Sequence, residues 1–306
     1  MAYLIGVDVG GTNLRVGVVH GMNVIYEKRS HADFSGICQH NRPLEACKQI
    51  VSTTSKLLRE VMLEYPDVQS VGIGFPGFIN PDNGVVIQSP NLPGLSNVDL
   101  ASQLTESLGI PVIVENDALA AAYGEFRLHP HELDNLIYLG LGTGVGGGLI
   151  YGSKPFAGQH GIAMEAGHII VEPHGRLCGC GNRGCMEQYA SATGISKTYL
   201  ETTGKSAHAD EIAQLAQSGD IQAQHAYHVA GTALAQALAH IVKVVDVGCV
   251  VIGGGVSQAW PLMQEAFEHQ LAADLIPVLK DKVKVSISQS GDQAGIIGAA
   301  LLAEPK

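Results

Sequence analysis

The chain has 306 residues, 46% apolar and 15% charged, a composition typical of a folded protein and a length sufficient for two packed domains. Its 29 acidic and 18 basic residues give a formal charge of −11, which argues against a nucleic-acid backbone as partner. The N-terminal apolar run is interrupted at Asp8, and the most apolar later stretch at His240, Lys243 and Asp246. We therefore expect neither a signal peptide nor a segment of membrane-spanning length.

The first half of the chain begins with three predicted strands. They cover residues 3–9, 14–19 and 23–29 and form an antiparallel meander whose first corner is the turn Gly10-Gly11-Thr12. An amphipathic helix is predicted after Pro43, because apolar residues recur at helical spacing until Tyr65-Pro66. The elements expected next are a strand, a helix, a strand and an alanine-rich helix, at residues 71–75, 98–108, 112–114 and 118–126.

The second half repeats the opening theme. A strand at 136–141 enters the turn Gly142-Thr143-Gly144, and a strand at 145–151 leaves it. Two such strand–turn–strand units indicate two related lobes. The remaining expectations are a helix at 223–245, strands at 249–252 and 283–288, and a small-residue helix at 295–301. The pattern predicts an α/β fold with mixed sheets.

Four residues near the middle of the chain have the spacing of one metal site: His168, Cys178, Cys180 and Cys185. Three thiolates and an imidazole are the usual ligands of structural zinc, and glycines 179, 181 and 184 allow the backbone to turn tightly. Reduced cysteines in a glycine-rich loop, or a disulfide, are the alternatives. The other cysteines, Cys38, Cys47 and Cys249, are scattered, which suits a reducing cytoplasm.

Glycine turns after strands can hold phosphate groups, because backbone N–H groups there can approach phosphate oxygens closely. A glycine after a strand is, taken alone, more often a plain turn. Two of the three turns share a Gly-Thr design, which strengthens the nucleotide reading, whereas P-loop and Rossmann fingerprints do not fit. The candidate phosphate and nucleotide residues are Asp8, Gly10, Gly11, Thr12 and Asn13, then Gly142, Thr143 and Gly144, and finally Gly254 and Gly255.

A carboxylate stands where the strand at 112–114 meets the following helix. Asp117 could accept the proton of a hydroxyl that attacks phosphorus, while Asn116 directs that hydroxyl. The alternative is that Asp117 merely caps the helix. Glu165 and Glu187 flank the metal residues and could accept hydrogen bonds from polyol hydroxyls, although solvation is the commoner fate of a glutamate.

These motifs together resemble the ROK family of sugar kinases and repressors over nearly the whole chain. The most specific parts are Glu165-x-Gly-His168 and the run from Cys178 to Glu187. The resemblance implies an actin-like, hexokinase-type ATPase fold with two lobes around a central cleft. It also implies transfer of the γ-phosphoryl group of ATP, bound with Mg²⁺, to a hexose hydroxyl. A homodimer is expected from the same resemblance, and the cysteine pattern places it in the cytoplasm.

Carried over by position, Asp117 matches the catalytic base of the family. The sugar contacts are Gly77, Asn91, Asn116, Asp117, Glu165, His168 and Glu187, and the three glycine turns match the family's phosphate and adenosine turns. One ring nitrogen of His168 would bind zinc and the other would face a sugar hydroxyl. The lobes are expected at residues 1–117 with 291–306, and at 118–290.

Glucose is the first choice of sugar, because the run 178–189 and Ser89-Pro90-Asn91-Leu92-Pro93-Gly94 look like those of ROK glucokinases. Phe78 offers no partner for an N-acetyl group, whereas Leu119 departs from the glucokinase pattern. Allose, mannose, fructose, N-acetylmannosamine and N-acetylglucosamine therefore stay open, as does a non-catalytic sugar sensor. The repressor reading is disfavoured, since the first strand begins at Tyr3 and the charge is acidic.

Overall fold

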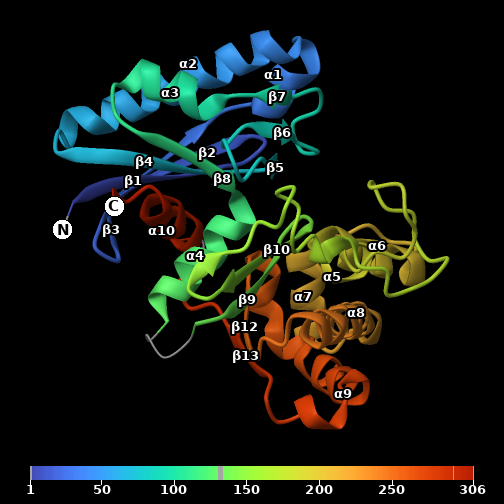
Figure 1. The fold of residues 1–306 in the computed structure, drawn as a ribbon. Helices are drawn as coiled ribbons and strands as arrows, with labels where there is room; N and C mark the ends of the chain where they lie inside the picture. Colours follow the sequence, from blue (N-terminus) through green and yellow to red (C-terminus); the bar gives the residue numbers. More distant parts are fainter. Residues whose placement is uncertain (1, 130–133, 292, 306) are drawn as a thin grey trace. The chain divides into compact units, whose positions relative to one another are not determined.

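The computed structural model describes residues 2–129, 134–291 and 293–305 (Figure 1). The chain divides into two compact units. Unit 1 comprises residues 1–134, 148–163 and 292–306, and unit 2 comprises residues 135–147 and 164–291. The helix that follows Asp117 belongs to unit 1 in this division. The predicted C-terminal segment includes residues 292 and 306, which lie outside the described residues.

Unit 1 contains a five-stranded sheet in the order β3-β2-β1-β4-β8. The strands are β1 (Tyr3–Val9), β2 (Asn13–His20), β3 (Asn23–His31), β4 (Val68–Phe75) and β8 (Val112–Asn116). Strands β1, β2 and β3 pair antiparallel, which confirms the predicted meander. Strands β1, β4 and β8 run parallel, so their carboxyl ends share one edge, where Asp8 pairs with Gly74 and Phe75 with Asn116.

The helices of unit 1 lie on both faces of this sheet (Figure 1). They are α1 (Phe34–His40), α2 (Pro43–Glu64), α3 (Leu100–Leu108), α4 (Asp117–Leu128) and α10 (Gln293–Leu302). The predicted helix at 98–108 begins at Leu100, because Val98 ends a strand of a small second sheet formed by β5 (Phe78–Ile79), β6 (Val86–Gln88) and β7 (Ser96–Val98). Helices α2 and α3 bury leucines and valines against one face of the main sheet.

A second five-stranded sheet has the order β11-β10-β9-β12-β13. Its strands are β9 (Leu136–Leu141), β10 (Val145–Tyr151), β11 (Lys154–Pro155), β12 (Cys249–Gly253) and β13 (Lys284–Ile287). The helices of unit 2 are α5 (Glu187–Ala190), α6 (Ala192–Thr203), α7 (Ala209–Gln217), α8 (Ile221–Val245) and α9 (Gln264–Asp274). Strand β12 pairs parallel with β9, so Gly253 lies beside Gly140 where both strands end.

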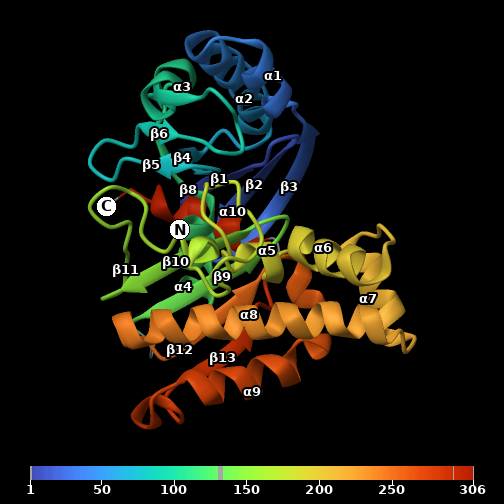
Figure 2. The same cartoon turned by 90° about the vertical axis from the view of Figure 1, so that its right-hand side faces the viewer.

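Helix α8 is the longest element of unit 2 and lies beside α9 (Figure 2). Among the described residues it is the one helix whose length and composition would allow it to cross a membrane, contrary to our expectation that no segment is long enough. Within its most apolar window 56% of the residues are buried inside the protein. Alanine and leucine side chains give it this buried surface, as is common for the core helix of a folded unit.

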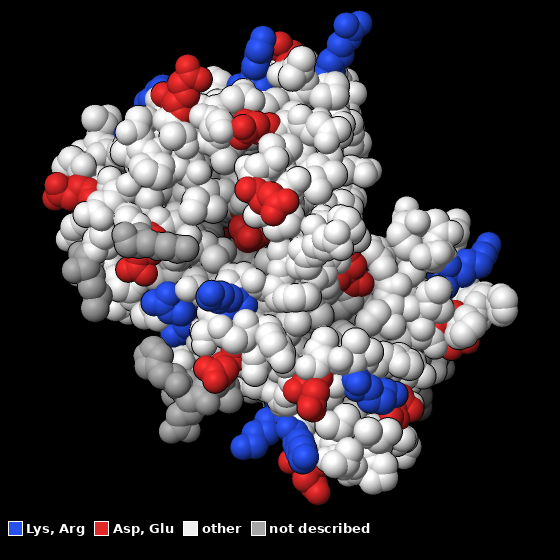
Figure 3. Space-filling model, viewed as in Figure 1, with Lys and Arg blue, Asp and Glu red and all other residues white. Residues whose placement is uncertain are grey.

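Charged side chains are mixed on the face of the molecule drawn in Figure 3. Lys and Arg side chains there are dispersed among acidic ones over many elements.

The C-terminal helix α10 packs closely on β1, β4 and α4, because glycines occupy the contact points. A Cβ atom on Gly72 of β4 would overlap the carbonyl oxygen of Ala299, and one on Gly298 of α10 would overlap that of Ala120. The backbones approach so closely that no side chain fits between them. Gly295 of the same helix meets nothing within 4 Å.

We predict that Gly298→Ala lowers the free energy of unfolding by about 1–3 kcal/mol, because the new methyl group overlaps backbone that cannot move aside easily. Gly295→Ala is the matched control. It should be neutral or stabilising by up to about 1 kcal/mol, since alanine favours a helix where space is open. Urea unfolding of both variants checks this, and equal effects would contradict the close packing of α10.

Candidate functional site

Asn116 and Asp117 stand at the carboxyl end of β8, where α4 begins. The side-chain oxygen of Asn116 accepts a hydrogen bond from the Leu119 amide at 2.9 Å, so the helix cap is Asn116. Its amide nitrogen donates to the carbonyl of Gly77 at 3.0 Å. Asp117 Oδ1 accepts from the amide of the next residue, Ala118, at 2.8 Å. The two residues therefore have separate tasks, and Asn116 supplies the cap that Asp117 was considered for.

The backbone conformation requires glycine at position 77, because Gly77 has a φ of 150°, in the region that favours glycine. A Cβ atom there would approach the carbonyl oxygen of Gln88 to 2.6 Å. The hydroxyl of Ser89 also donates to the carbonyl of Pro76. These contacts bind the loop 89–94, which carries Asn91, to the turn that holds Asn116.

Glu115 precedes this pair and was not singled out from the sequence. Its carboxyl oxygen accepts from the backbone amide of Asn116 at 2.8 Å. Burial raises the pKa of the Glu115 carboxyl, and the hydrogen bond from Asn116 offsets only part of that shift. Glu115 follows a run of apolar residues predicted to form a buried strand, and this feature of the sequence could have indicated a carboxyl group with a raised pKa.

The first glycine turn follows β1. The Gly10 amide donates to the carbonyl of Asn13 at 2.8 Å, and the Asn13 side chain donates to the Thr12 hydroxyl at 3.2 Å. Asp8 lies 3.6 Å from a guanidinium nitrogen of Arg15. Arg15 also contacts Glu27, whose pKa is lowered because hydrogen bonds from arginines outweigh the opposing effect of burial.

Ser35, which sequence reasoning missed, connects this turn to the Asn91 loop. Its amide donates to the carbonyl of Gly11 at 2.9 Å, and its hydroxyl donates to the carbonyl of Asn91 at 3.2 Å. A Cβ atom on Gly11 would approach the Ser35 hydroxyl to 2.6 Å. Glycine at position 11 thus leaves space for Ser35, and the first turn and the Asn91 loop are held together within unit 1.

The second glycine turn joins β9 to β10 and contacts Glu187. Glu187 Oε2 accepts from the Val145 amide at 3.0 Å and occupies the space where a side chain on Gly144 would stand. The third turn lies beside the second, because a Cβ atom on Gly254 would overlap the backbone of Leu141. Ser257 donates to the carbonyl of Gly254 at 2.7 Å through its hydroxyl and holds the third turn.

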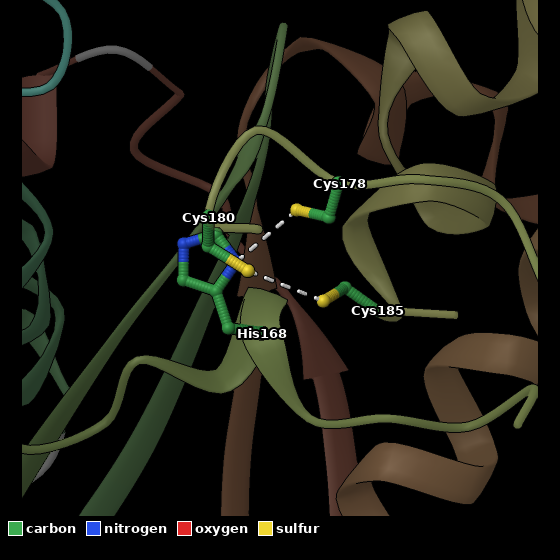
Figure 4. Close-up of side chains that lie close together, drawn as sticks. All are labelled: His168, Cys178, Cys180 and Cys185. Carbon is green, nitrogen blue, oxygen red and sulfur yellow. Dashed lines mark hydrogen bonds between the residues drawn. The ribbon is translucent and has the colours of Figure 1, made fainter. Parts of the chain in front are cut away.

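The four predicted metal-binding residues lie together in unit 2 (Figure 4). Their ligand atoms lie within 4.8 Å of one another. The sulfurs of Cys180 and Cys185 are 3.6 Å apart, whereas a disulfide bond needs about 2.05 Å. A tetrahedral zinc ion with Zn–S bonds of about 2.3 Å would separate two sulfurs by roughly 3.8 Å. The geometry therefore fits a metal ion and not a disulfide.

The loop that carries the cysteines depends on glycine at Gly181 and Gly184, with φ of 94° and 77°. A Cβ atom on Gly184 would overlap the carbonyl of Glu172. Hydrogen bonding from the Asn182 backbone lowers the pKa of the Cys180 thiol. Burial and the neighbouring thiols raise the pKa of Cys185 to about 12. A divalent cation at this position would favour the thiolate form of every cysteine in the cluster.

His168 has different neighbours at its two ring nitrogens. Nδ1 lies 3.6 Å from the sulfur of Cys178, and Nε2 lies 3.7 Å from a carboxyl oxygen of Glu165. Partial burial raises the pKa of Glu165; His168 opposes that shift and the charge of Glu187 adds to it. Glu187 Oε1 lies 4.0 Å from the Cys178 sulfur. Unit 2 thus brings Glu165, His168, Glu187 and the thiols together.

The predicted site residues are therefore gathered in two groups. In unit 1 the contacts join Gly77, Asn91, Asn116 and the first glycine turn through Ser35 and Ser89. In unit 2 they join the second and third glycine turns, the two glutamates and the metal-binding cluster.

Comparison with known proteins places this arrangement in one class. The family model described as the ROK family matches residues 4–306, and the chain belongs to this family. It is 34% identical to a glucokinase of Thermotoga maritima over 97% of this chain and 96% of that protein. It is 31% identical to an N-acetylmannosamine kinase of Escherichia coli over 98% of both.

Among solved structures, a ROK family glucokinase from Streptomyces griseus, in complex with glucose and AMPPNP, superposes with a TM-score of 0.82. It is 30% identical, and the alignment covers 98% of this chain and 99% of that one. The predicted actin-like, hexokinase-type fold is thereby confirmed.

We predict that Glu115→Gln stabilises the protein at neutral pH and that this gain disappears below about pH 4. Because the pKa is raised in the folded state, the folded protein keeps its proton longer than the unfolded chain. The contribution of Glu115 to stability thus falls as pH rises from the ordinary glutamate value through the raised one. Thermal unfolding of both proteins between pH 4 and 8 checks this; a difference that does not change with pH would contradict it.

Proposed function

We propose that this member of the ROK family is an ATP-dependent hexose kinase that transfers the γ-phosphoryl group to glucose, giving glucose 6-phosphate. The observation that carries the proposal is the Asn116–Asp117 pair at the end of β8. Asn116 caps α4, while Asp117 stands at its first turn. The similarity to a glucokinase at 34% identity supports glucose as the acceptor.

In this proposal Asp117 is the general base. Its carboxylate accepts the proton of the hexose hydroxyl as that oxygen attacks phosphorus, and Asn116 orients the hydroxyl. Asn116 keeps capacity for this task, because a side-chain amide has two N–H donors and the structure assigns one of them to Gly77. The sugar contacts we propose are Gly77, Asn91, Asn116, Asp117, Glu165, His168 and Glu187.

ATP is held by the three glycine turns in the same proposal. The amides of Gly10 and Gly142 close their turns by donating to the carbonyls of Asn13 and Gly144. The other backbone amides of turns 10–13 and 142–144 face phosphate oxygens in this proposal, and Gly254 with Gly255 passes the adenosine. Gly255 has open space around its α-carbon, which suits close approach of a ligand. Asp8 supplies a carboxylate for the magnesium ion that accompanies ATP, and magnesium neutralises charge on the phosphates.

The metal held by the cysteine cluster is zinc in this proposal, with a structural role. Three sulfurs and one imidazole form a closed set of soft ligands. Binding through Nδ1 fixes the His168 ring, so that Nε2 faces Glu165 and the sugar hydroxyl. We further propose that the protein acts in the cytoplasm as a homodimer, as the family resemblance implies.

N-acetylmannosamine is the second candidate substrate, because the E. coli kinase for that sugar is similar over nearly all of this chain. The half-buried Phe78 favours glucose over it, since an apolar ring offers no hydrogen bond to an N-acetyl carbonyl. The choice is tested by measuring ADP release with glucose, mannose, allose, fructose and both N-acetylhexosamines. Release with none of them would support a sugar sensor and contradict the kinase proposal.

We predict that Asp117→Asn lowers kcat about 10²–10⁴-fold while hexose binding persists, because the amide cannot take the hydroxyl proton but keeps the shape of the side chain. Asp67→Asn is the matched control, since it removes the same charge from an exposed turn of unit 1. Turnover measurements and calorimetric hexose titrations of both variants check this. Near-normal turnover of Asp117→Asn would assign the base elsewhere.

We predict that Cys180→Ala lowers zinc content and raises the hexose KM, because one of four ligands is lost and His168 is no longer fixed. Cys249→Ala removes a thiol that is not among the four clustered ligands and should leave both unchanged. Elemental analysis and steady-state kinetics provide the measurements. A metal-free protein with the wild-type KM would contradict a link between zinc and sugar binding.

A further inference from the structure

Helices α5 and α6 are separated by a break at Ser191, which has extended backbone angles of −83° and 168°. Ser191 begins α6 by accepting from the Gly194 amide at 3.0 Å. The amide of Ala192 does not donate back along a helix to Gln188. It donates to the carbonyl of Gly142 in the second glycine turn at 2.9 Å. The break therefore leaves the Gln188 carbonyl without its helical donor, because the Ala192 amide binds the second glycine turn instead.

Arg176 supplies the donor that the break requires. Its Nη1 donates to the carbonyl of Gln188 at 2.7 Å and to that of Gly194 at 3.1 Å, one on each side of Ser191. A buried carbonyl that lacks a donor is unfavourable, because it has lost its hydrogen bonds to water without replacement. The guanidinium group thus stabilises a helix break that would otherwise be unfavourable.

The remaining donors of Arg176 are also engaged. Nε and Nη2 contact the carboxylate of Glu201 at 3.1 and 2.5 Å, and Nη2 donates to the Thr198 hydroxyl at 3.0 Å. The guanidinium carbon lies 4.6 Å from the centre of the Tyr189 ring, and the Tyr189 hydroxyl accepts from the Arg176 amide at 3.0 Å. The side chain is 14% exposed. This combination of contacts requires the planar guanidinium group of arginine, which directs several N–H donors at once.

The junction held by Arg176 connects three parts of the proposed active site. Glu187 begins α5 and accepts from the Val145 amide beside the second glycine turn. Thr193 on α6 donates to the carbonyl of Thr143 in that turn at 2.8 Å. Arg176 itself lies two residues before the metal-binding Cys178. The metal loop, the proposed sugar contact and the phosphate turn therefore meet at one helix break.

We infer that Arg176 is a positioning residue that fixes Glu187 and the turn 142–144 relative to the metal-binding loop, and so supports hexose and ATP binding together. This inference rests on the proposed function for its hexose part. Arg176 acts through its neighbours and does not contact the reacting atoms. Without Arg176 the metal site would keep its four ligands, but its loop would lose the hydrogen bonds to the carbonyls on either side of Ser191.

The test compares Arg176→Gln with wild type, both saturated with zinc. We expect the KM values for hexose and for ATP to rise together by about tenfold, with a smaller effect on kcat. Arg176→Lys should fall between them, because an ammonium replaces the fork with a single charge. Arg183→Gln is the control. Arg183 lies exposed in the same loop, and its side chain donates to the Gly175 carbonyl at 3.3 Å, so both KM values should stay unchanged.

Two readouts do not depend on turnover. The equilibrium Kd of a non-hydrolysable ATP analogue should weaken in Arg176→Gln, and the absorption spectrum of the Co²⁺-substituted protein reports whether the S₃N ligand set is intact. If wild type phosphorylates no hexose, the proposed function fails, while the Kd comparison still decides the role of Arg176.

A folded, metal-loaded Arg176→Gln protein with wild-type KM values and analogue Kd would overturn the inference, even if its melting temperature were lower. Should that variant not fold, Glu201→Ala provides the second test. It removes the half-exposed carboxylate that holds Nε and Nη2 and leaves the arginine in place. The same constants should shift in the same direction by a smaller factor, and unchanged constants there would also overturn the inference.

Discussion

The carboxylate of Glu187 is the group on which the arrangement of unit 2 depends. One oxygen accepts the Val145 amide, and the other lies near the sulfur of Cys178. The first contact is possible only because residue 144 is glycine, and both place the start of α5 between the turn and the cysteines. A helix that must begin at this carboxylate and yet return a backbone amide to Gly142 cannot continue unbroken, which accounts for the interruption at Ser191.

With a charge of −11, this protein would bind the triphosphate of ATP, as proposed, against its own electrostatic repulsion. The proposed phosphate residues meet this need mainly with backbone dipoles, which carry no net charge and stay fixed by neighbouring hydrogen bonds. Ser35 and Asn13 hold the first turn, and Thr193 holds the second. Arg15 supplies a nearby positive charge, and its contacts with Asp8 and Glu27 fix its position.

Much of the fold could be predicted from local patterns. Apolar residues recur at strand or helix spacing along the predicted elements, so their sequence alone was sufficient. These elements are strands β1 to β3, strands β9 and β10 around the second turn, and helices α2, α4, α8 and α10. Helices α1, α5, α6, α7 and α9 and strands β5 to β7 and β11 were not predicted. Of these, α1 and β5 to β7 span seven residues or fewer, and their existence depends on packing against the main sheet. The start of α3 was misplaced because Val98 continues the apolar pattern of the helix but pairs with Val86.

The site shows the same division between local and distant information. The cysteine spacing was sufficient to predict that four ligands converge, because short loops leave few other arrangements. The roles of Ser35 and Arg176 could not be predicted, since each contacts carbonyl groups that only the folded chain brings near. Glu115 was missed because its shifted pKa comes from the depth of a strand end, and not from a neighbouring charge that a sequence displays.

The packing of α10 in unit 1 has a consequence for the folding of the protein during its synthesis on the ribosome. The last helix covers one face of a sheet whose strands are made first, and no side chain can substitute for it between the glycines. At about 5–20 residues per second, synthesis of the chain between the end of β8 at Asn116 and the start of α10 at Gln293 leaves that apolar face uncovered for roughly 10–35 seconds. The nascent sheet therefore remains incomplete until α10 is synthesised. Chaperones that shield exposed apolar surface can bind the uncovered face during that interval.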